Sequence, residues 1–357
     1  MTRLPTSCVL LVVLTLTLGG GLGAVEPTTD SDTAAIAAKA AAAAPLVLVL
    51  RDEAVRKELR LTPAQRASID KLLADVDFPL WYVRDMKDAE TQDKRARAYD
   101  HVEKNLQTNL QAPQRSRIDG ILLQLHGWPT LLVPRFANAL ELSADQQSRI
   151  RDFLKPTPDD KGSLSSGELS AAKQKQIKGV LSDPQQRRLS QLMGPSFSAK
   201  QIRGRPCLAP AFEQVDQWFN SEPLDWRKLE GKVTAVHFWA FGCINCVRNL
   251  PHYKSWDEKY AAKGLVVVGF HTPETQAERI IESVGNKVKE NEIRYPVAVD
   301  GAAKNWNAWA TRWWPSVYLV DKRGYVRYWW YGELNWEGAK GEEFMRQKIE
   351  ELLAEKD

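Results

Sequence analysis

Two cysteines in the C-terminal half of the 357-residue chain have a spacing that suits thiol chemistry. Cys243 and Cys246 stand two residues apart in "HFWAFGCINC", directly after an apolar run that ends at Trp239. Such a pair can form a reversible redox couple, supply half of a zinc site, or close a structural disulfide. The residues around the pair bear on which of the three applies.

The rest of the sequence favours the redox couple. Zinc needs two more ligands, and the sequence has no second CxxC and no ligand-type spacing among its 5 histidines. A disulfide across two residues closes a loop far shorter than those that stabilise a fold most. Of the 4 cysteines, Cys8 falls in a predicted leader, and Cys207 falls in a predicted linker, where it is expected to be inert. A small number of cysteines, two of them in a CxxC motif, indicates a redox role rather than structural disulfides.

A reactive dithiol also needs a strand, a turn and a helix start in this order. The segment "KVTAVHFW" (232–239) is predicted to be a strand, Gly242 supplies the turn, and a helix follows from Cys243 to about Lys263. A helix start offers Cys243 free N–H groups and the positive end of the helix dipole, which stabilise a thiolate. Cys246, one turn into the helix, can then reach back to close the disulfide.

Strands and helices alternate along the rest of this half of the chain. The pattern predicts strands over 265–271, 295–300, 316–321 and 325–332, and helices over 275–291, 302–313 and 341–355. The last two strands form a hairpin around Lys322–Gly324. Alternating elements that end in a hairpin and a helix predict an α/β sandwich with a mixed sheet.

Residues 209–353 resemble an extracytoplasmic thioredoxin of the TlpA/DipZ group. The resemblance rests on "WFNSEPLDWRKLEGKVTAVHFWAFGCINC", on "LVVVGFHTPE" and on "NWNAWATRWWPSVYLVDKRGYVRY". It implies an α/β thioredoxin fold, with Cys243 as the nucleophile and Cys246 as the resolving thiol. It also implies that Trp314 and Pro315 form a cis-proline turn against the site, where the turn offers backbone to an extended substrate.

Several positions differ from the family pattern. Ile244 and Asn245 replace the Gly-Pro of thioredoxins proper, which leaves the redox potential unassigned, and Asn249 stands where TlpA-like proteins commonly have Glu. His237 occupies the position at which thioredoxins bury an acidic residue. By the resemblance, a neutral His237 would accept the proton of the resolving thiol. The alternative is a histidine that only packs in the sheet, and both interpretations stay open.

Weaker candidates lie at the end of the predicted strand 265–271. His271 is expected to point to the same sheet edge as the cysteines, and Glu274 follows it. A strand-end turn of packing residues explains them equally well.

The first 24 residues have the features of an export signal. Arg3 supplies the positive end, residues 8–18 form an apolar core, and a Gly/Ala run forms a cleavable neck. The apolar core is short for a membrane span, although an uncleaved N-terminal anchor is the alternative. Both interpretations place the folded part outside the cytoplasm, so a periplasmic or secreted location is expected. Residues 25–45 are predicted to be an Ala-rich tether.

Residues 46–194 are predicted to be an all-α domain with a weak repeat, L-x-x-x-Q-x-x-x-I, whose copies begin at Leu61, Leu110, Leu142 and Leu181. The residues after each Leu suit a helix start, and the apolar residue eight positions on faces the core. The copies resemble the L-T-x-x-Q motif of small periplasmic proteins of the Spy and CpxP type. Because each match covers only some nine residues, a helical packing module is favoured. A linker over 195–208 leads to the thioredoxin-like domain, 209–357.

The combined features predict a periplasmic thiol–disulfide oxidoreductase that acts on protein thiols and disulfides without a cofactor. The resemblance implies a membrane electron donor of the CcdA/DsbD type as a partner. One alternative is a thiol peroxidase on the same fold, although Ala240 stands where a peroxide-binding Thr or Ser is expected. Another is a binding or chaperone-like protein that acts through the helical domain. The net charge of +4 gives no argument for nucleic acid as a partner.

Overall fold

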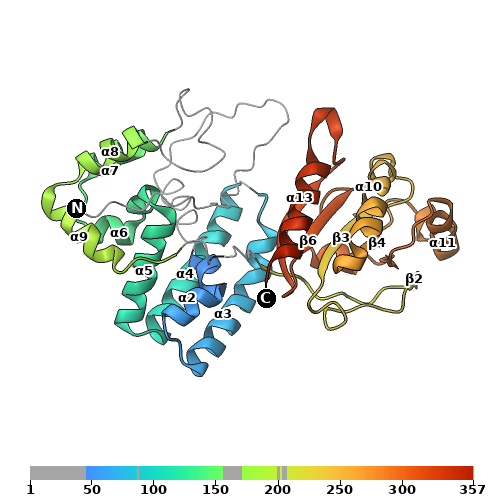
Figure 1. The fold of residues 1–357 in the computed structure, drawn as a ribbon, viewed down its shortest axis with the longest axis horizontal. Coiled ribbons are helices and arrows are strands. Elements are labelled where there is room, and N and C mark those ends of the chain that lie inside the picture. Colours follow the sequence, from blue (N-terminus) through green and yellow to red (C-terminus); the bar gives the residue numbers. More distant parts are fainter. Residues whose placement is uncertain (1–45, 87, 156–170, 199–201, 203–206, 357) are drawn as a thin grey trace. The chain divides into compact units, whose positions relative to one another are not determined.

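The computed structural model describes residues 46–86, 88–155, 171–198, 202 and 207–356. The chain divides into two compact units, Met1–Gly204 and Arg205–Asp357, and each is described by itself (Figure 1). The predicted export signal and tether, residues 1–45, lie outside the described residues, as does half of the predicted linker. Among the helices of the described ranges, none combines the length and the apolar character needed to cross a bilayer.

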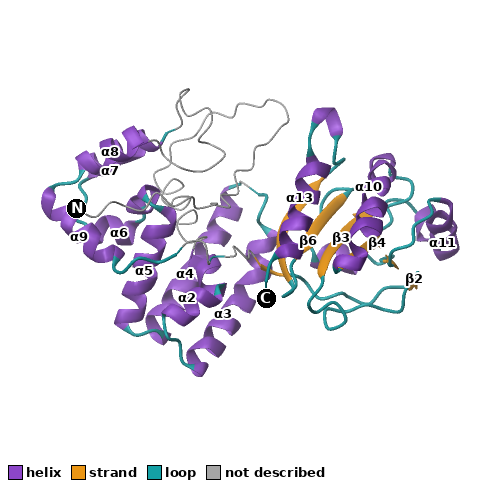
Figure 2. Cartoon of the chain, in the orientation of Figure 1, coloured by secondary structure: helices purple, strands orange, loops and turns teal. Residues whose placement is uncertain are grey.

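The described part of the first unit consists of helices (Figure 2). They are α2 (Glu53–Glu58), α3 (Pro63–Tyr82), α4 (Ala89–Asn109), α5 (Ala112–His126), α6 (Pro134–Ala139), α7 (Ala144–Leu154), α8 (Ala171–Val180) and α9 (Asp183–Met193), with a 3-10 turn η1 (Trp128–Leu132) after α5. Their apolar sides form one core, in which the repeat residues Ile69, Ile118 and Ile150 are buried. The core explains why the apolar residue of each repeat recurs at a fixed distance from the helix start.

The repeated glutamines join these helices in two reciprocal pairs. The Gln65 and Gln114 side chains donate to each other's oxygen at 2.9 and 3.1 Å, and Gln146 and Gln185 do the same at 2.8 and 3.1 Å. Each glutamine oxygen also accepts the backbone N–H of its own N-cap residue. The repeat therefore marks the starts of α3, α5, α7 and α9, which pair two by two.

We expect Gln146→Ala to lower the free energy of unfolding of the helical unit by about 1–3 kcal/mol. The change removes the bonds of Gln146 to Gln185, to the Val180 carbonyl and to its own helix start. Urea unfolding followed by far-UV circular dichroism measures the difference. Gln191→Ala, on the exposed side of α9, is the matched control and should change stability by less than about 0.5 kcal/mol. Equal stability of the two variants would show that the glutamine pairs add nothing.

The second unit is built on a mixed seven-stranded sheet in the order β1-β7-β6-β3-β4-β5-β2. The strands are β1 (Cys207–Leu208), β2 (Gln217–Phe219), β3 (Val233–Trp239), β4 (Leu265–His271), β5 (Val297–Val299), β6 (Ser316–Val320) and β7 (Tyr325–Tyr331). Strands β3, β4 and β5 run parallel, whereas the remaining pairings are antiparallel. All residues of β3 are buried, as expected for a central strand that is covered on both faces.

Both faces of this sheet are covered. Helices α10 (Ile244–Tyr260), α11 (Ile281–Glu290) and α13 (Gly341–Ala354) pack on one face, and Figure 1 shows α10 lying along β3 and β4. On the other face, Phe238 of β3 meets the rings of Phe270, Trp309 and Tyr318. The short helix α12 (Lys304–Ala308) leads to this aromatic cluster. A mixed sheet flanked by helices confirms the predicted α/β thioredoxin fold.

The structure corrects the predicted elements in three places. The helix predicted over 275–291 is split, because the extended backbone of Ile280 separates a 3-10 turn from α11. The helix predicted over 302–313 is confined to α12, since Ala310 adopts a positive φ of 47° that a helix does not accommodate. Cys207, predicted to lie in a linker, is buried in β1 and pairs with β7. The edge strands β1 and β2 were not predicted.

Candidate active site

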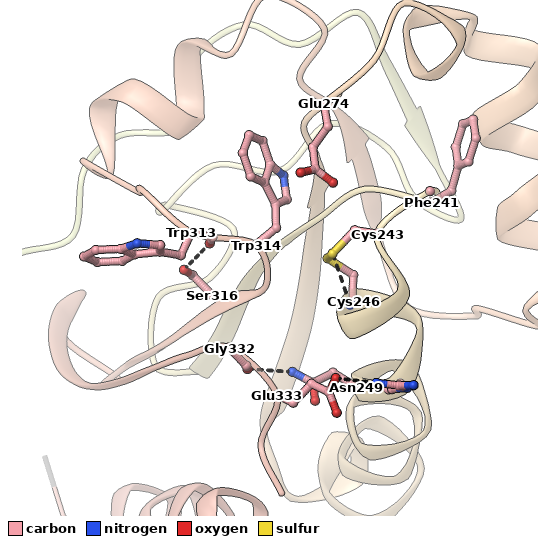
Figure 3. Close-up of a disulfide and its surroundings, with 12 residues drawn as sticks. Phe241, Cys243, Cys246, Asn249, Glu274, Trp313, Trp314, Ser316, Gly332 and Glu333 are labelled. Carbon is pink, nitrogen blue, oxygen red and sulfur yellow. Dashed lines mark hydrogen bonds and ion pairs between the residues drawn. A yellow bond between two sulfur atoms is a disulfide. The ribbon is translucent and has the colours of Figure 1, made fainter. Parts of the chain in front are cut away.

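Strand β3, the turn that follows it and the start of α10 position the two cysteines. Cys243 is the N-cap residue of α10, with an extended backbone that ends the turn. The Cys246 N–H donates to the Cys243 sulfur at 3.3 Å, so the cap position itself directs a helix N–H at this sulfur. The two residues form a disulfide with Cα atoms 5.2 Å apart (Figure 3).

The two cysteines differ in exposure. Cys243 is half-buried, whereas none of the Cys246 surface is exposed. Ile244, the first residue of α10 after Cys243, is 60% exposed, so the helix start faces solvent. Attack on a substrate disulfide needs an accessible sulfur. The geometry therefore suits Cys243 for contact with a substrate and Cys246 for an internal attack on Cys243.

A second loop lies opposite the disulfide, directly before β6. The Trp314–Pro315 peptide bond is cis, in agreement with what the resemblance implies. The Trp314 indole N–H donates to the Thr272 carbonyl at 3.1 Å, and its ring stacks on Trp306 with 3.8 Å between centroids. These contacts hold the turn in place, and Figure 3 shows Trp313 and Trp314 across the site from the cysteines.

Asn249 ties α10 to the segment that follows β7. Its buried side chain donates to the Gly332 carbonyl at 3.1 Å and to the Tyr253 hydroxyl at 3.2 Å, and accepts the Leu334 N–H at 3.0 Å. Figure 3 shows Asn249 beside Gly332 and Glu333, below the disulfide. An ionised glutamate has no N–H to give to Gly332. The difference from the family pattern at this position therefore has a structural reason.

Two side chains from the end of β4 and the segment after it hold the turn before Cys243. His271 Nε2 accepts the Phe241 N–H at 3.3 Å, and the Glu278 carboxylate accepts the Gly242 N–H at 2.7 Å. His271 was a weak candidate in the sequence, but Glu278 was missed. Nothing in the local pattern separates Glu278 from the solvent-facing glutamates of an amphipathic helix, which was predicted there.

His237 points into the α10 side of the sheet and is fully buried. Its ring stacks on Tyr253 with 4.2 Å between centroids and meets Tyr295 edge-on at 5.5 Å. Gly269, its partner on β4, leaves room for the ring, because a Cβ at that position would come within 2.7 Å of His237 Nε2. Neither ring nitrogen has a hydrogen-bond partner in the described part of the chain. Burial lowers the pKa of His237 to about 3.

These contacts favour the packing interpretation of His237 over the proton relay. The ring stacks on Tyr253, which lies about two helical turns beyond Cys246 along α10. A base whose conjugate acid has a pKa of about 3 is also poorly matched to a thiol with an ordinary pKa of about 8.5. We therefore propose that His237 supports the site by filling the space between the sheet and α10.

His237→Phe, which keeps an aromatic ring against Tyr253, tests this interpretation. We expect resolution of a mixed disulfide on Cys243 to stay within about twofold of the wild-type rate, because no proton acceptor is lost. Stopped-flow measurement of resolution, with the rate of Cys243 alkylation as the internal control, compares the two steps. If resolution instead slows by about tenfold or more while the alkylation rate is unchanged, His237 acts as the proton relay and not only in packing.

The comparisons with known proteins concern the second unit. Residues 207–329 match the AhpC/TSA family. Protein DipZ of Mycobacterium bovis is 38% identical over 128 residues, which are 35% of this chain and 18% of DipZ. The thiol-disulfide oxidoreductase YkuV of Bacillus subtilis is 25% identical over 138 residues, 39% of this chain and 88% of YkuV. The thiol-disulfide oxidoreductase ResA of Bacillus cereus is 28% identical over 118 residues, 33% of this chain and 64% of ResA.

A solved structure of similar size to the second unit is also found. The thioredoxin-like superfamily protein SPOA0173 covers 42% of this chain and 97% of its own, at 28% identity and a TM-score of 0.38. The chain spans only 18% of the length of DipZ. The family match and the sequence relatives, taken with the sheet order and the CxxC at a helix start, identify the second unit as a thioredoxin-like domain.

Proposed function

We propose that the protein is an extracytoplasmic thiol–disulfide oxidoreductase that acts on protein thiols and disulfides through Cys243 and Cys246. One observation carries the proposal: a disulfide joins a half-buried N-cap cysteine to a fully buried cysteine one turn into the same helix. The relatives YkuV and ResA, which are named thiol-disulfide oxidoreductases, support the same chemistry.

The arrangement suits a two-step exchange. In the reduced protein the Cys243 thiolate, stabilised by the Cys246 N–H and the start of α10, attacks one sulfur of a substrate disulfide. A mixed disulfide forms and the other substrate sulfur leaves as a thiolate. Cys246 then loses its proton, attacks the Cys243 sulfur and releases the second substrate thiolate. The substrate gains two electrons, and the protein is left with the Cys243–Cys246 disulfide.

The surface beside the cysteines suits an extended polypeptide substrate. Ile244 is 60% exposed on the α10 side, and Trp313 is 46% exposed on the opposite loop. Pro315 places a main-chain turn between β6 and this exposed indole. Apolar side chains of a substrate would contact Ile244 and Trp313, while the turn at Pro315 would offer its backbone.

The proposed function also includes a location and a source of electrons. The predicted export signal supports a place outside the cytoplasm, where no soluble thioredoxin system keeps thiols reduced. A reductase in that place needs two electrons per cycle from another dithiol. By the resemblance, the donor is a membrane protein of the CcdA/DsbD type.

Insulin reduction tests the proposed function. With dithiothreitol as the donor, the full chain is expected to precipitate the insulin B chain well before dithiothreitol alone does, because Cys243 exchanges faster than a small thiol. A parallel assay for hydrogen peroxide consumption tests the peroxidase alternative. Ala240 speaks against this alternative, because it is buried and has no hydroxyl with which to bind peroxide. Failure to accelerate insulin reduction, or consumption of peroxide instead, would contradict the proposal.

A further inference from the structure

Glu278 is a buried carboxylate at the dithiol site that the exchange described above does not use. Only 1% of its surface is exposed. One oxygen accepts the Gly242 N–H at 2.7 Å. The other accepts the N–H groups of Glu274 and Thr275, each at 2.8 Å, and the Thr275 hydroxyl at 3.2 Å. Burial raises the pKa of this carboxyl, but the N–H donors outweigh burial, so that the pKa lies below its ordinary value and the group is charged near neutral pH.

The carboxylate lies directly against the turn that carries the nucleophile. Gly242 immediately precedes Cys243, and a Cβ at position 242 would come within 2.8 Å of Glu278 Oε1. The Gly242 N–H is therefore committed to Glu278 and not to the neighbouring sulfur. A side chain at this position would therefore have to displace the Glu278 carboxylate from the turn.

The Glu278 carboxylate is held by hydrogen bonds from N–H and hydroxyl groups rather than by an ion pair. No Lys or Arg within residues 207–356 forms an ion pair with it. His271, on the same side of the turn, is neutral near pH 7, since burial lowers its pKa to about 4. The nearby Glu274 adds a second negative charge, but it is exposed, and Figure 3 shows its carboxylate between Trp314 and the cysteines. A buried, unpaired negative charge acts at longer range than an exposed one.

We propose that Glu278 is a positioning residue, which holds the Gly242 turn in place and whose charge opposes the Cys243 thiolate, so that the dithiol couple stays more reducing. The inference rests on the proposed function of the dithiol. A like charge near a thiol disfavours ionisation, and destabilising the thiolate shifts the equilibrium from dithiol toward disulfide. A more reducing couple suits a protein that donates electrons to its substrates better than one that oxidises them.

The test compares Glu278→Gln with two matched variants. We expect Glu278→Gln to lower the pKa of Cys243 by about 0.5 to 1, so that iodoacetamide alkylation at mildly acidic pH becomes about three to ten times faster. A tenfold change in the oxidation equilibrium corresponds to a potential less negative by about 30 mV. Glu282→Gln, an exposed carboxylate at the start of α11, should change neither quantity. Glu278→Asp keeps the charge and should keep the pKa of Cys243, even where it lowers stability.

The outcomes separate the inference from the proposed function. An unchanged or higher pKa of Cys243 in folded Glu278→Gln would overturn the inference. A merely structural role of Glu278 would change the stability of the fold but not the pKa of the Cys243 thiol. Lack of insulin reduction by the wild-type chain would overturn the proposed function alone. Where Glu278→Gln does not fold, the Gly242 amide signal of the wild-type chain is followed by NMR during acid titration. It should report a carboxyl titration below about pH 4.5, and a signal that does not respond would overturn the inference.

Discussion

Replacing Cys243 with serine is expected to abolish reductase turnover, with a loss of at least roughly 10³-fold in the rate of insulin reduction. The hydroxyl of serine is not a nucleophile toward disulfides, and the buried Cys246 cannot meet a protein substrate in place of Cys243. The insulin assay with dithiothreitol as donor measures the loss. Cys207→Ala is the matched control, since Cys207 is buried in β1 and is not part of the disulfide, and it should keep the wild-type rate.

The companion change, Cys246→Ser, separates the two steps. The first attack by Cys243 should persist, while the mixed disulfide accumulates because the internal attack is lost. Non-reducing electrophoresis of the reduced Cys246→Ser variant mixed with a disulfide-containing protein substrate should show an adduct that dithiothreitol removes. More than about a tenth of wild-type turnover in Cys243→Ser, or no adduct with Cys246→Ser, would reverse the assigned roles.

Acid is expected to destabilise the thioredoxin-like unit well above the pH at which carboxylates are protonated. Burial lowers the pKa of His237 to about 3 and that of His271 to about 4, from about 6.5 in the unfolded chain. Below about pH 6.5 the unfolded chain takes up protons that the folded unit excludes, so stability falls with pH until the folded pKa is reached. Each histidine contributes a slope of up to about 1.4 kcal/mol per pH unit.

Together the two histidines should lower the free energy of unfolding by about 3–4 kcal/mol between about pH 8 and pH 5. Urea unfolding at a series of pH values, followed by the signal of the buried tryptophans of this unit, gives the slope. His237→Phe removes one of the two groups and should roughly halve the slope between about pH 6.5 and pH 5. An equal slope in this variant would show that His237 is protonated in the folded protein.

The sequence predicted the parts of the site that are contiguous along the chain. Strand β3, Gly242, Cys243 and Cys246 lie within one short segment, and each has a local signature, so their arrangement follows from strand, turn and helix patterns alone. Pro315 was identified by resemblance, because a cis bond has no signature in a single sequence. The sequence left His237 open, since its role depends on which rings surround it.

Features that rest on long-range contacts could not be predicted. Glu278 and Gly242 are 36 residues apart, and their contact depends on a break at Ile280 inside a segment with a helical pattern. The glutamine repeat predicted helix starts, but the pairing of Gln65 with Gln114 spans 49 residues and has no local signal. Strands β1 and β2 have 2 and 3 residues, too few for any periodicity to appear.

The reduction potential of the full chain shows whether Cys243 and Cys246 form an exchange couple. The chain is equilibrated in dithiothreitol and glutathione redox buffers, and the thiol state of Cys243 and Cys246 is read by alkylation and peptide mass spectrometry. An exchange dithiol predicts one two-electron couple confined to these residues, with a potential between about −120 and −270 mV, the range of thioredoxin-like oxidoreductases. A potential below about −300 mV, typical of structural disulfides that resist reduction, would contradict the account.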